Sequence, residues 1–129
     1  MIKKASEFFS ILTEGRYSRL YRPLGESTVT VEDSNGVMKG PEHLSRGTKE
    51  QLYLALRLGA IGEAMANNER LPVIVDEVLV NFDPVRARRA AEAFVKLAEQ
   101  TQVMVFTCHP WIADLFEEVA GKHRVISLD

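Results

Sequence analysis

The sequence lacks most of the features that define specialised classes of protein. Its one cysteine, Cys108, excludes a disulfide within the chain, and no Cys/His cluster has the spacing of a metal motif. We expect Cys108 to be buried as a small apolar side chain. A run of 18 apolar residues and a signal-peptide pattern are both missing. We therefore expect a reducing, cytoplasmic location and no membrane partner.

An excess of charge is missing as well. The formal net charge of the 129 residues is −2, which gives no electrostatic argument for nucleic acid. The basic residues near the first helix and strand are too few to establish such a surface. Hydrophobic content of 46% and charged content of 26% are ordinary for a globular protein, and the length predicts one domain, residues 1–129.

The sequence also has no phosphate-binding loop of the form G-x-x-x-x-G-K-[ST]. Its only Gly-Lys pair, Gly121-Lys122, is followed by His123. The chain therefore lacks the main cradle for the α- and β-phosphates of a nucleotide.

The first half of the chain predicts a helix followed by a β-hairpin. Apolar residues at i, i+3, i+4 and i+7 spacing predict an amphipathic helix that ends near Gly15; they are Ala5, Phe8, Phe9 and Leu12. Residues 17–22 and 28–33 predict strands, and Asn35-Gly36 predicts the tight turn of the hairpin.

A second amphipathic helix is predicted from about Thr48 to Asn67. Its apolar stripe consists of Leu54, Leu58, Ile61 and Met65. A strip of small residues runs beside it, formed by Ala55, Gly59 and Gly62. Small side chains at helical spacing predict close packing of this helix against another element.

The second half of the chain alternates predicted strands and helices. Residues 71–77, 103–107 and 124–128 are the strands, and the first of them is a continuous apolar run typical of a strand buried on both faces. Asp83-Pro84 and His109-Pro110 each open a helix. This alternation predicts a largely parallel α/β sheet.

Polar residues stand where two of these strands end. Asp76 and Glu77 could hold Mg²⁺ and orient an attacking water, or could be solvated acids at the end of a strand. His109 could donate a hydrogen bond to a phosphate, or could be a cap or a surface histidine. Asp83 is explained by helix capping alone.

The segment LSRGTKEQ, residues 44–51, precedes the second helix. Ser45 or Thr48 could cap the helix, and Thr48 with Gln51 matches a T-x-x-Q capping box. Free N–H groups, the Ser45 hydroxyl and the close approach permitted by Gly47 could also bind a phosphate, with Arg46 adding positive charge. The two interpretations are compatible.

The order of four motifs is more specific than any one of them. LSRG with Gln51, then VDE (75–77), NFDPVR (81–86) and TCHP (107–110) resembles the C-terminal lobe of an ABC-type ATPase head. More narrowly, the pattern resembles the SMC, SbcC and RecF-like group, including YhaN-like proteins. The resemblance implies the α/β fold of a P-loop NTPase, here a C-terminal lobe with a largely parallel sheet, flanking helices and an N-terminal β-hairpin.

The resemblance also implies roles for single residues. Ser45 and Gly47 would contact the γ-phosphate of ATP held by a different head, with Arg46 and Gln51 in the same nucleotide-binding segment. Asp76 would be the Walker B aspartate that supports Mg²⁺, and Glu77 the catalytic base. The other two roles are those of Asp83 in the D-loop and His109 as the switch histidine.

Two features set this chain apart from a complete head. Arg46 occupies a position that is glycine in many ABC signatures, and the phosphate loop is absent. The resemblance implies that an N-terminal lobe with a Walker A loop completes the head, that residues 1–15 end a coiled-coil arm, and that the chain alone is an inactive ATPase. Further implied partners are a second head, DNA and a nuclease subunit. Two alternatives are a fragment of a transporter's nucleotide-binding domain and a non-catalytic assembly or regulatory lobe.

Overall fold

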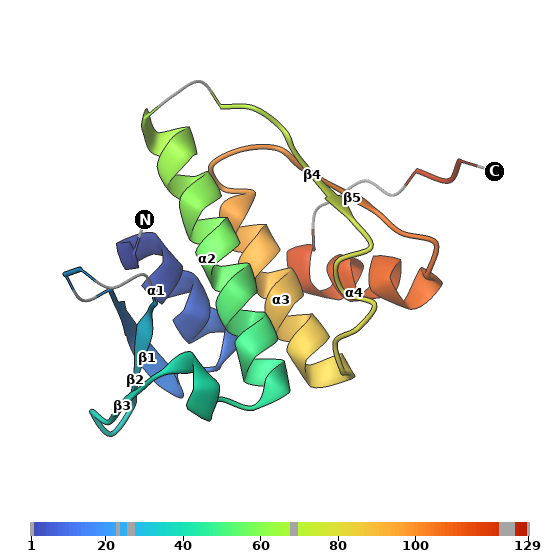
Figure 1. The fold of residues 1–129 in the computed structure, drawn as a ribbon. Coiled ribbons are helices and arrows are strands. Elements are labelled where there is room, and N and C mark those ends of the chain that lie inside the picture. Colours follow the sequence, from blue (N-terminus) through green and yellow to red (C-terminus); the bar gives the residue numbers. More distant parts are fainter. Residues whose placement is uncertain (1, 23, 26–27, 68–69, 122–125, 129) are drawn as a thin grey trace. The chain divides into compact units, whose positions relative to one another are not determined.

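The computed structural model describes residues 2–22, 24–25, 28–67, 70–121 and 126–128. The chain divides into two compact units, residues 1–70 and residues 71–129, here called the first and second unit. Figure 1 follows the chain through them. The first unit contains α1 (Ile2–Leu12), β1 (Tyr17–Tyr21), β2 (Thr30–Asp33), β3 (Met38–Lys39), the 3₁₀ turn η1 (Pro41–His43) and α2 (Arg46–Asn67). The second contains β4 (Val73–Asp76), α3 (Pro84–Leu97), β5 (Val103–Phe106) and α4 (Pro110–Ala120).

The core of the first unit lies where α1 packs on α2. The apolar stripe of α1 is buried as predicted, through Ala5, Phe8, Phe9 and Leu12. Gly59 of α2 lies against this helix: a Cβ placed on Gly59 would lie 2.6 Å from the backbone nitrogen of Ala5. The predicted close packing is confirmed, and its partner is the first helix.

The predicted β-hairpin is also confirmed. β1 pairs antiparallel with β2, and β2 with β3. In the turn, Gly36 has a φ of +83°, a conformation that glycine adopts without strain. The carboxylate of Asp33 accepts hydrogen bonds from the N–H groups of Asn35 and Val37, each at 2.9 Å, which fixes the turn.

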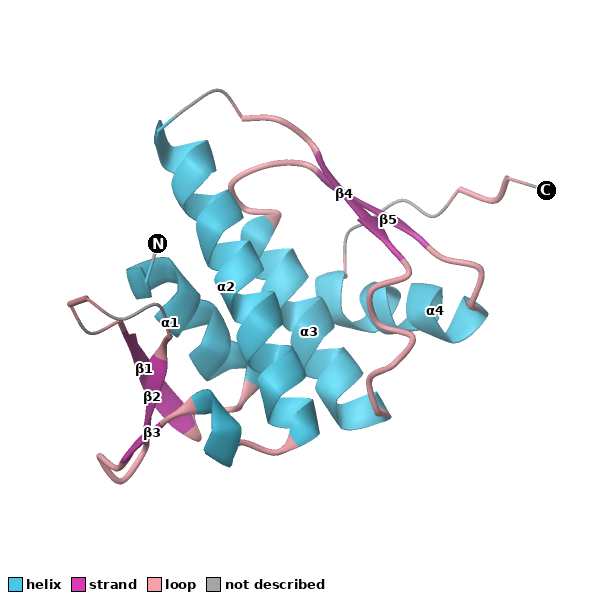
Figure 2. Ribbon diagram, viewed as in Figure 1, coloured by secondary structure: helices cyan, strands magenta, loops and turns pink. Residues whose placement is uncertain are grey.

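The second unit contains the predicted parallel strand pair. Val73 pairs with Val103, and Asp76 pairs with Phe106, so β4 and β5 run in register. Parallel strands place their carboxyl ends at the same edge, and the segments that follow Asp76 and Phe106 therefore leave the sheet together. Figure 2 shows the two strands side by side.

The prediction that the first of these strands is buried on both faces is wrong. Val75 is buried, but on the opposite face Ile74 is 67% exposed, and Met104 and Phe106 are each 41% exposed. Within the described residues this sheet has two strands, and the face that carries these three side chains is partly exposed. The apolar run therefore forms a strand with one buried face and one exposed face.

Two helices follow the strands of the second unit. Asp83 caps α3, as predicted, and the rings of Phe94 on α3 and Phe116 on α4 pack with centroids 6.4 Å apart. The predicted strand at 124–128 is not found in its described part: residues 126–128 have no strand, and residues 124 and 125 lie outside the described residues. None of the described helices has the length and apolar character needed to span a membrane.

Candidate active site at the carboxyl ends of two strands

The chain turns sharply where β4 ends. Asp76 is the last residue of the strand and is exposed, whereas Glu77 has a φ of +53°, which is uncommon for a residue with a side chain. The N–H of Glu77 donates to the carbonyl of Phe106 at 3.1 Å, which ties the turn to the neighbouring strand. Side chains in a strand point alternately to opposite faces. The turn ends this alternation, so the direction of the Glu77 side chain does not follow from that of Asp76.

The carboxylate of Glu77 is held by the segment that follows β5. One oxygen, Oε1, accepts a hydrogen bond from the backbone N–H of Cys108 at 2.6 Å. The other, Oε2, accepts from the hydroxyl of Thr107 at 3.2 Å. The backbone donor is the largest cause that lowers the pKa of Glu77 below its usual value of 4.5. Glu77 is therefore ionised near neutral pH and can accept a hydrogen bond from water.

His109 lies next to this carboxylate. Its Nε2 is 3.9 Å from Oε2 of Glu77, and its backbone N–H donates to the Thr107 hydroxyl at 3.1 Å. His109 precedes α4 but makes no capping bond with its side chain, which is 44% exposed. The imidazole is thus available for a ligand, since helix capping does not occupy it.

Cys108 does not have the environment that the sequence predicts. It is exposed, and its backbone N–H is one of the donors that orient Glu77. A hydrogen bond with the Glu77 carboxylate is the largest cause that raises the pKa of the Cys108 thiol. The apolar character of the preceding strand suggested burial, but the strand has ended by this point. Thr107 and the Cys108 backbone were missed as functional groups, although the polar TCHP run was the signal.

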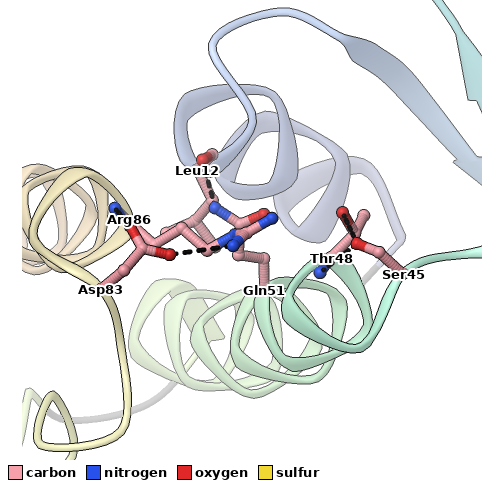
Figure 3. A network of polar contacts seen from close by, with 6 residues as sticks. All are labelled: Leu12, Ser45, Thr48, Gln51, Asp83 and Arg86. Atoms are coloured by element: carbon pink, nitrogen blue, oxygen red, sulfur yellow. Dashed lines mark hydrogen bonds and ion pairs between the residues drawn. The ribbon is translucent and has the colours of Figure 1, made fainter.

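Asp83 also lies in the second unit, at the start of α3. Its Oδ1 accepts the backbone N–H of Arg86 at 3.0 Å, and its Oδ2 accepts from the Arg86 guanidinium at 2.8 Å (Figure 3). The backbone bond is the largest cause that lowers the pKa of Asp83 below its usual value of 3.8. The capping interpretation is confirmed.

Residues 44–51, here called the signature segment, contain the start of α2 in the first unit. Ser45 caps this helix: its Oγ accepts the N–H of Thr48 at 3.2 Å and donates to the Thr48 hydroxyl at 2.8 Å (Figure 3). Thr48 lies inside α2 and Ser45 directly precedes the helix, so Ser45 and not Thr48 is the cap. Arg46 follows with a side chain that is 96% exposed. Gly47 lies in the first turn, where backbone N–H groups have no acceptor within the helix.

Gln51 is the exception in this segment. Its side chain is buried, and its amide nitrogen donates to the carbonyl of Leu12, the last residue of α1, at 2.6 Å (Figure 3). It therefore does not complete a capping box with Thr48. The amide joins α2 to the end of α1, because it donates to a carbonyl at the C-terminus of α1 that has no partner within α1.

The structure thus brings together Asp76, Glu77 and His109 at one edge of the sheet. The carboxylate of Asp76 is exposed and offers the hard oxygen donors that Mg²⁺ prefers, so the residues fit the metal that the resemblance implies. Asp83 lies on the next helix of the same unit. Ser45, Arg46, Gly47 and Gln51 form a separate group in the first unit.

Comparison with known proteins extends these observations. No family model matches the sequence. The chain is 34% identical over 126 residues to the uncharacterized protein YhaN of Bacillus subtilis, covering 97% of this chain and 13% of YhaN. It is 31% identical over 96 residues to the DNA double-strand break repair Rad50 ATPase of Methanocaldococcus jannaschii, covering 74% of this chain and 9% of that protein.

Solved structures agree with these sequence matches. The SMC head domain from Thermotoga maritima superposes with a TM-score of 0.65 at 20% identity, over 92% of this chain and 40% of that chain. A structure of an SMC ATPase, from work on ATP-driven dimerization and DNA-stimulated activation, gives a TM-score of 0.69 at 20% identity, over 99% of this chain and 76% of that chain. The chain is a C-terminal lobe of the SMC, SbcC and RecF-like ATPase heads. It spans about a tenth of the length of the curated relatives it matches.

Proposed function

We propose that this lobe is half of an ATPase head that hydrolyses ATP at the interface between two heads. The observation that carries the proposal is the Glu77 carboxylate, which Thr107 and the Cys108 backbone hold at the strand ends beside His109. A fixed, ionised carboxylate at this edge is suited to orient a water molecule and accept its proton. Phosphoryl transfer needs such positioning more than covalent chemistry from the protein.

Asp76 and His109 complete the chemistry of the second unit. Asp76 would hold Mg²⁺ through its exposed carboxylate, and the bound ion would supply positive charge beside the phosphates. His109 would donate a hydrogen bond from its exposed imidazole to the γ-phosphate. The Thr107 hydroxyl accepts the N–H of His109 and donates to Glu77, which supports both residues from one point.

The signature segment would serve the nucleotide of the opposite head. Ser45 and Gly47 stand at the start of a 22-residue helix, whose first N–H groups and positive dipole favour a phosphate. Arg46, almost fully exposed, would add a cation there. Gln51 would not contact the nucleotide, because its side chain is buried and hydrogen-bonded to the carbonyl of Leu12. Asp83 would lie in the D-loop at the same interface, in addition to its capping role.

An N-terminal lobe would complete the head. The chain has no phosphate loop, and its parallel strands expose an apolar face through Ile74, Met104 and Phe106. A second segment would add strands to the edge of the sheet, other elements that cover this face, and the missing loop. Helix α1 would then be the end of a coiled-coil arm that joins the two lobes.

The cellular role we propose is DNA repair or recombination in the cytoplasm, with a nuclease subunit as a further partner. The sequence similarity to a double-strand break repair ATPase supports this choice over transport. Association of the full-length protein with DNA, measured with and without ATP, tests it. We expect tighter association with ATP; equal binding in both conditions would contradict the DNA role.

The shared interface is tested by mixing two inactive heads. One head carries Glu77→Gln and the other carries Ser45→Arg, each reconstituted with its N-terminal lobe. If the signature acts on the opposite head, each mixed dimer has one intact site, and random mixing restores about a quarter of the wild-type ATP hydrolysis. If the signature acts within its own head, no mixed dimer has an intact site, and a mixture without activity would overturn the proposal.

A further inference from the structure

Glu77, Cys108 and His109 form a cluster of potential metal ligands at the strand ends. Each offers one donor atom, a carboxylate oxygen, a thiol sulfur and an imidazole nitrogen, and these three atoms all lie within 4.8 Å of one another. We propose that the cluster binds a Zn²⁺-like transition-metal ion and that the bound ion inhibits ATP hydrolysis. The inhibitory half of this proposal rests on the proposed ATPase function; the binding half does not.

The spacing of the donors is close to that of a zinc site. Zinc binds nitrogen and oxygen at roughly 2.0–2.2 Å and sulfur at about 2.3 Å, so donors on one tetrahedral ion are roughly 3.3–3.7 Å apart. Nε2 of His109 and Oε2 of Glu77 are 3.9 Å apart, too far for a hydrogen bond and near the separation of two zinc ligands. The exposed Cys108 side chain can approach by rotation about its own bond.

The backbone around the cluster is already fixed. The N–H of Cys108 donates to Oε1 of Glu77, the N–H of Glu77 donates to the Phe106 carbonyl, and the N–H of His109 donates to Thr107. The three ligands are therefore held on two neighbouring segments without a metal. A site arranged in this way loses less conformational entropy when the ion binds.

The types of donor select the metal. Thiolate and imidazole favour Zn²⁺ and its neighbours over Mg²⁺, whereas the lone carboxylate of Asp76 offers only oxygen. Three protein ligands leave a fourth position open to water, as in zinc sites that stay accessible. The side chains of Glu77 and His109 are 32% and 44% exposed, so an ion can enter from solvent. The sequence alone does not predict this site, because Glu77 follows β4 whereas Cys108 and His109 follow β5.

Inhibition of ATP hydrolysis follows because the ion would occupy donor atoms that the proposed reaction uses. A carboxylate oxygen of Glu77 that ligates zinc is no longer a base for water, and an imidazole nitrogen of His109 that ligates zinc cannot donate to a phosphate. Zinc and Mg²⁺ would thus act on neighbouring residues with opposite effects on hydrolysis.

The binding test uses the complete chain with Co²⁺ as a spectroscopic substitute for Zn²⁺. We expect a sulfur-to-cobalt charge-transfer band that stoichiometric Zn²⁺ abolishes. Cys108→Ser removes the band, and Cys108→Ser and His109→Ala each weaken zinc binding at least tenfold. The matched control is His43→Ala, which alters an exposed histidine 3.5 Å from Glu42 and leaves binding unchanged. Circular dichroism of each variant verifies folding. A missing band, or variants that bind like the wild type, would refute the site.

The inhibition test uses the chain reconstituted with its N-terminal lobe in excess Mg²⁺. Zinc lowers the rate, a zinc chelator restores it, and Cys108→Ser raises the half-inhibitory zinc concentration at least tenfold relative to its own zinc-free rate. Zinc that binds without slowing hydrolysis would overturn the inhibitory role. A reconstituted head that binds zinc but never hydrolyses ATP would contradict the ATPase proposal and leave the metal site standing.

Discussion

The backbone N–H of Cys108 donates to a carboxylate oxygen of Glu77 at 2.6 Å, and this bond joins two residues 31 positions apart in sequence, just after the parallel strands β4 and β5. The bond does not depend on the cysteine side chain. It orients the acid that the proposed chemistry needs and keeps it ionised.

Thr107 should be a positioning residue for this acid. Thr107→Val removes the hydroxyl that donates to Glu77 and accepts from His109. We expect kcat of the reconstituted head to fall about tenfold with little change in KM, since one hydrogen bond to a charged group contributes about 1.4 kcal/mol or more. Thr107→Ser retains the hydroxyl and should restore the rate. A serine variant as slow as the valine variant would argue against this role.

The contribution of Glu77 to the stability of the chain should change with pH only in the acid range, where it is lost. Because the folded-state pKa of Glu77 lies below its usual value of 4.5, its contribution is complete above that pH and is lost as the pH falls through the folded pKa. Urea unfolding of the wild type and of Glu77→Gln should differ by a constant free energy from pH 5 to pH 8, and the difference should shrink below pH 4.5. A difference that grows in acid would contradict the assigned hydrogen bonds.

Asp83 should stabilise α3 as a cap and not through its ion pair. Asp83→Ala should lower the free energy of unfolding by about 1 kcal/mol, the usual cost of losing an N-cap. Asp83→Asn keeps an oxygen acceptor for the Arg86 N–H and should cost much less, because a partly exposed ion pair contributes little. Equal losses in the two variants, measured by urea unfolding, would show that the charge matters more than the cap.

The contact between α1 and α2 should not tolerate a methyl group at Gly59. Alanine is the better helix former by about 1 kcal/mol, but its Cβ would lie 2.6 Å from the Ala5 backbone nitrogen. We expect Gly59→Ala to lower the free energy of unfolding by about 1–3 kcal/mol, because backbone must shift. The control is Ala60→Gly on the exposed side of the same helix, which measures helix propensity alone. A stabilised Gly59→Ala variant would refute the close approach.

Periodicity and turn chemistry predicted most of this fold from sequence. The stripe of α1, the hairpin turn at Asn35-Gly36 and the cap at Asp83 each depend on local rules, and all three are found. The prediction that β4 is buried on both faces was wrong because an apolar run does not say which face of a strand another element covers. Ile74 and Val75 are both apolar, so the sequence does not predict that Val75 is buried and Ile74 exposed.

The sequence singled out some residues at the strand ends but not the contacts between them. Motif order identified Asp76, Glu77 and His109, yet nothing in the sequence revealed that Glu77 leaves the strand with a positive φ and bonds to Cys108. Gln51 shows the same limit, because its partner Leu12 is 39 residues away. Long-range polar contacts depend on tertiary packing, and local sequence patterns do not encode them.

ATP hydrolysis by separated and mixed lobes tests the central claim most directly. The rate is measured for this chain alone, for its N-terminal lobe alone and for an equimolar mixture of the two. The mixture is also prepared with Glu77→Gln and, as the matched control, with Glu99→Gln, which alters an exposed acid. We predict no turnover from either lobe, turnover from the mixture, and a loss of at least about 100-fold with Glu77→Gln only. Robust hydrolysis by this chain alone, abolished by Glu77→Gln, would contradict the account.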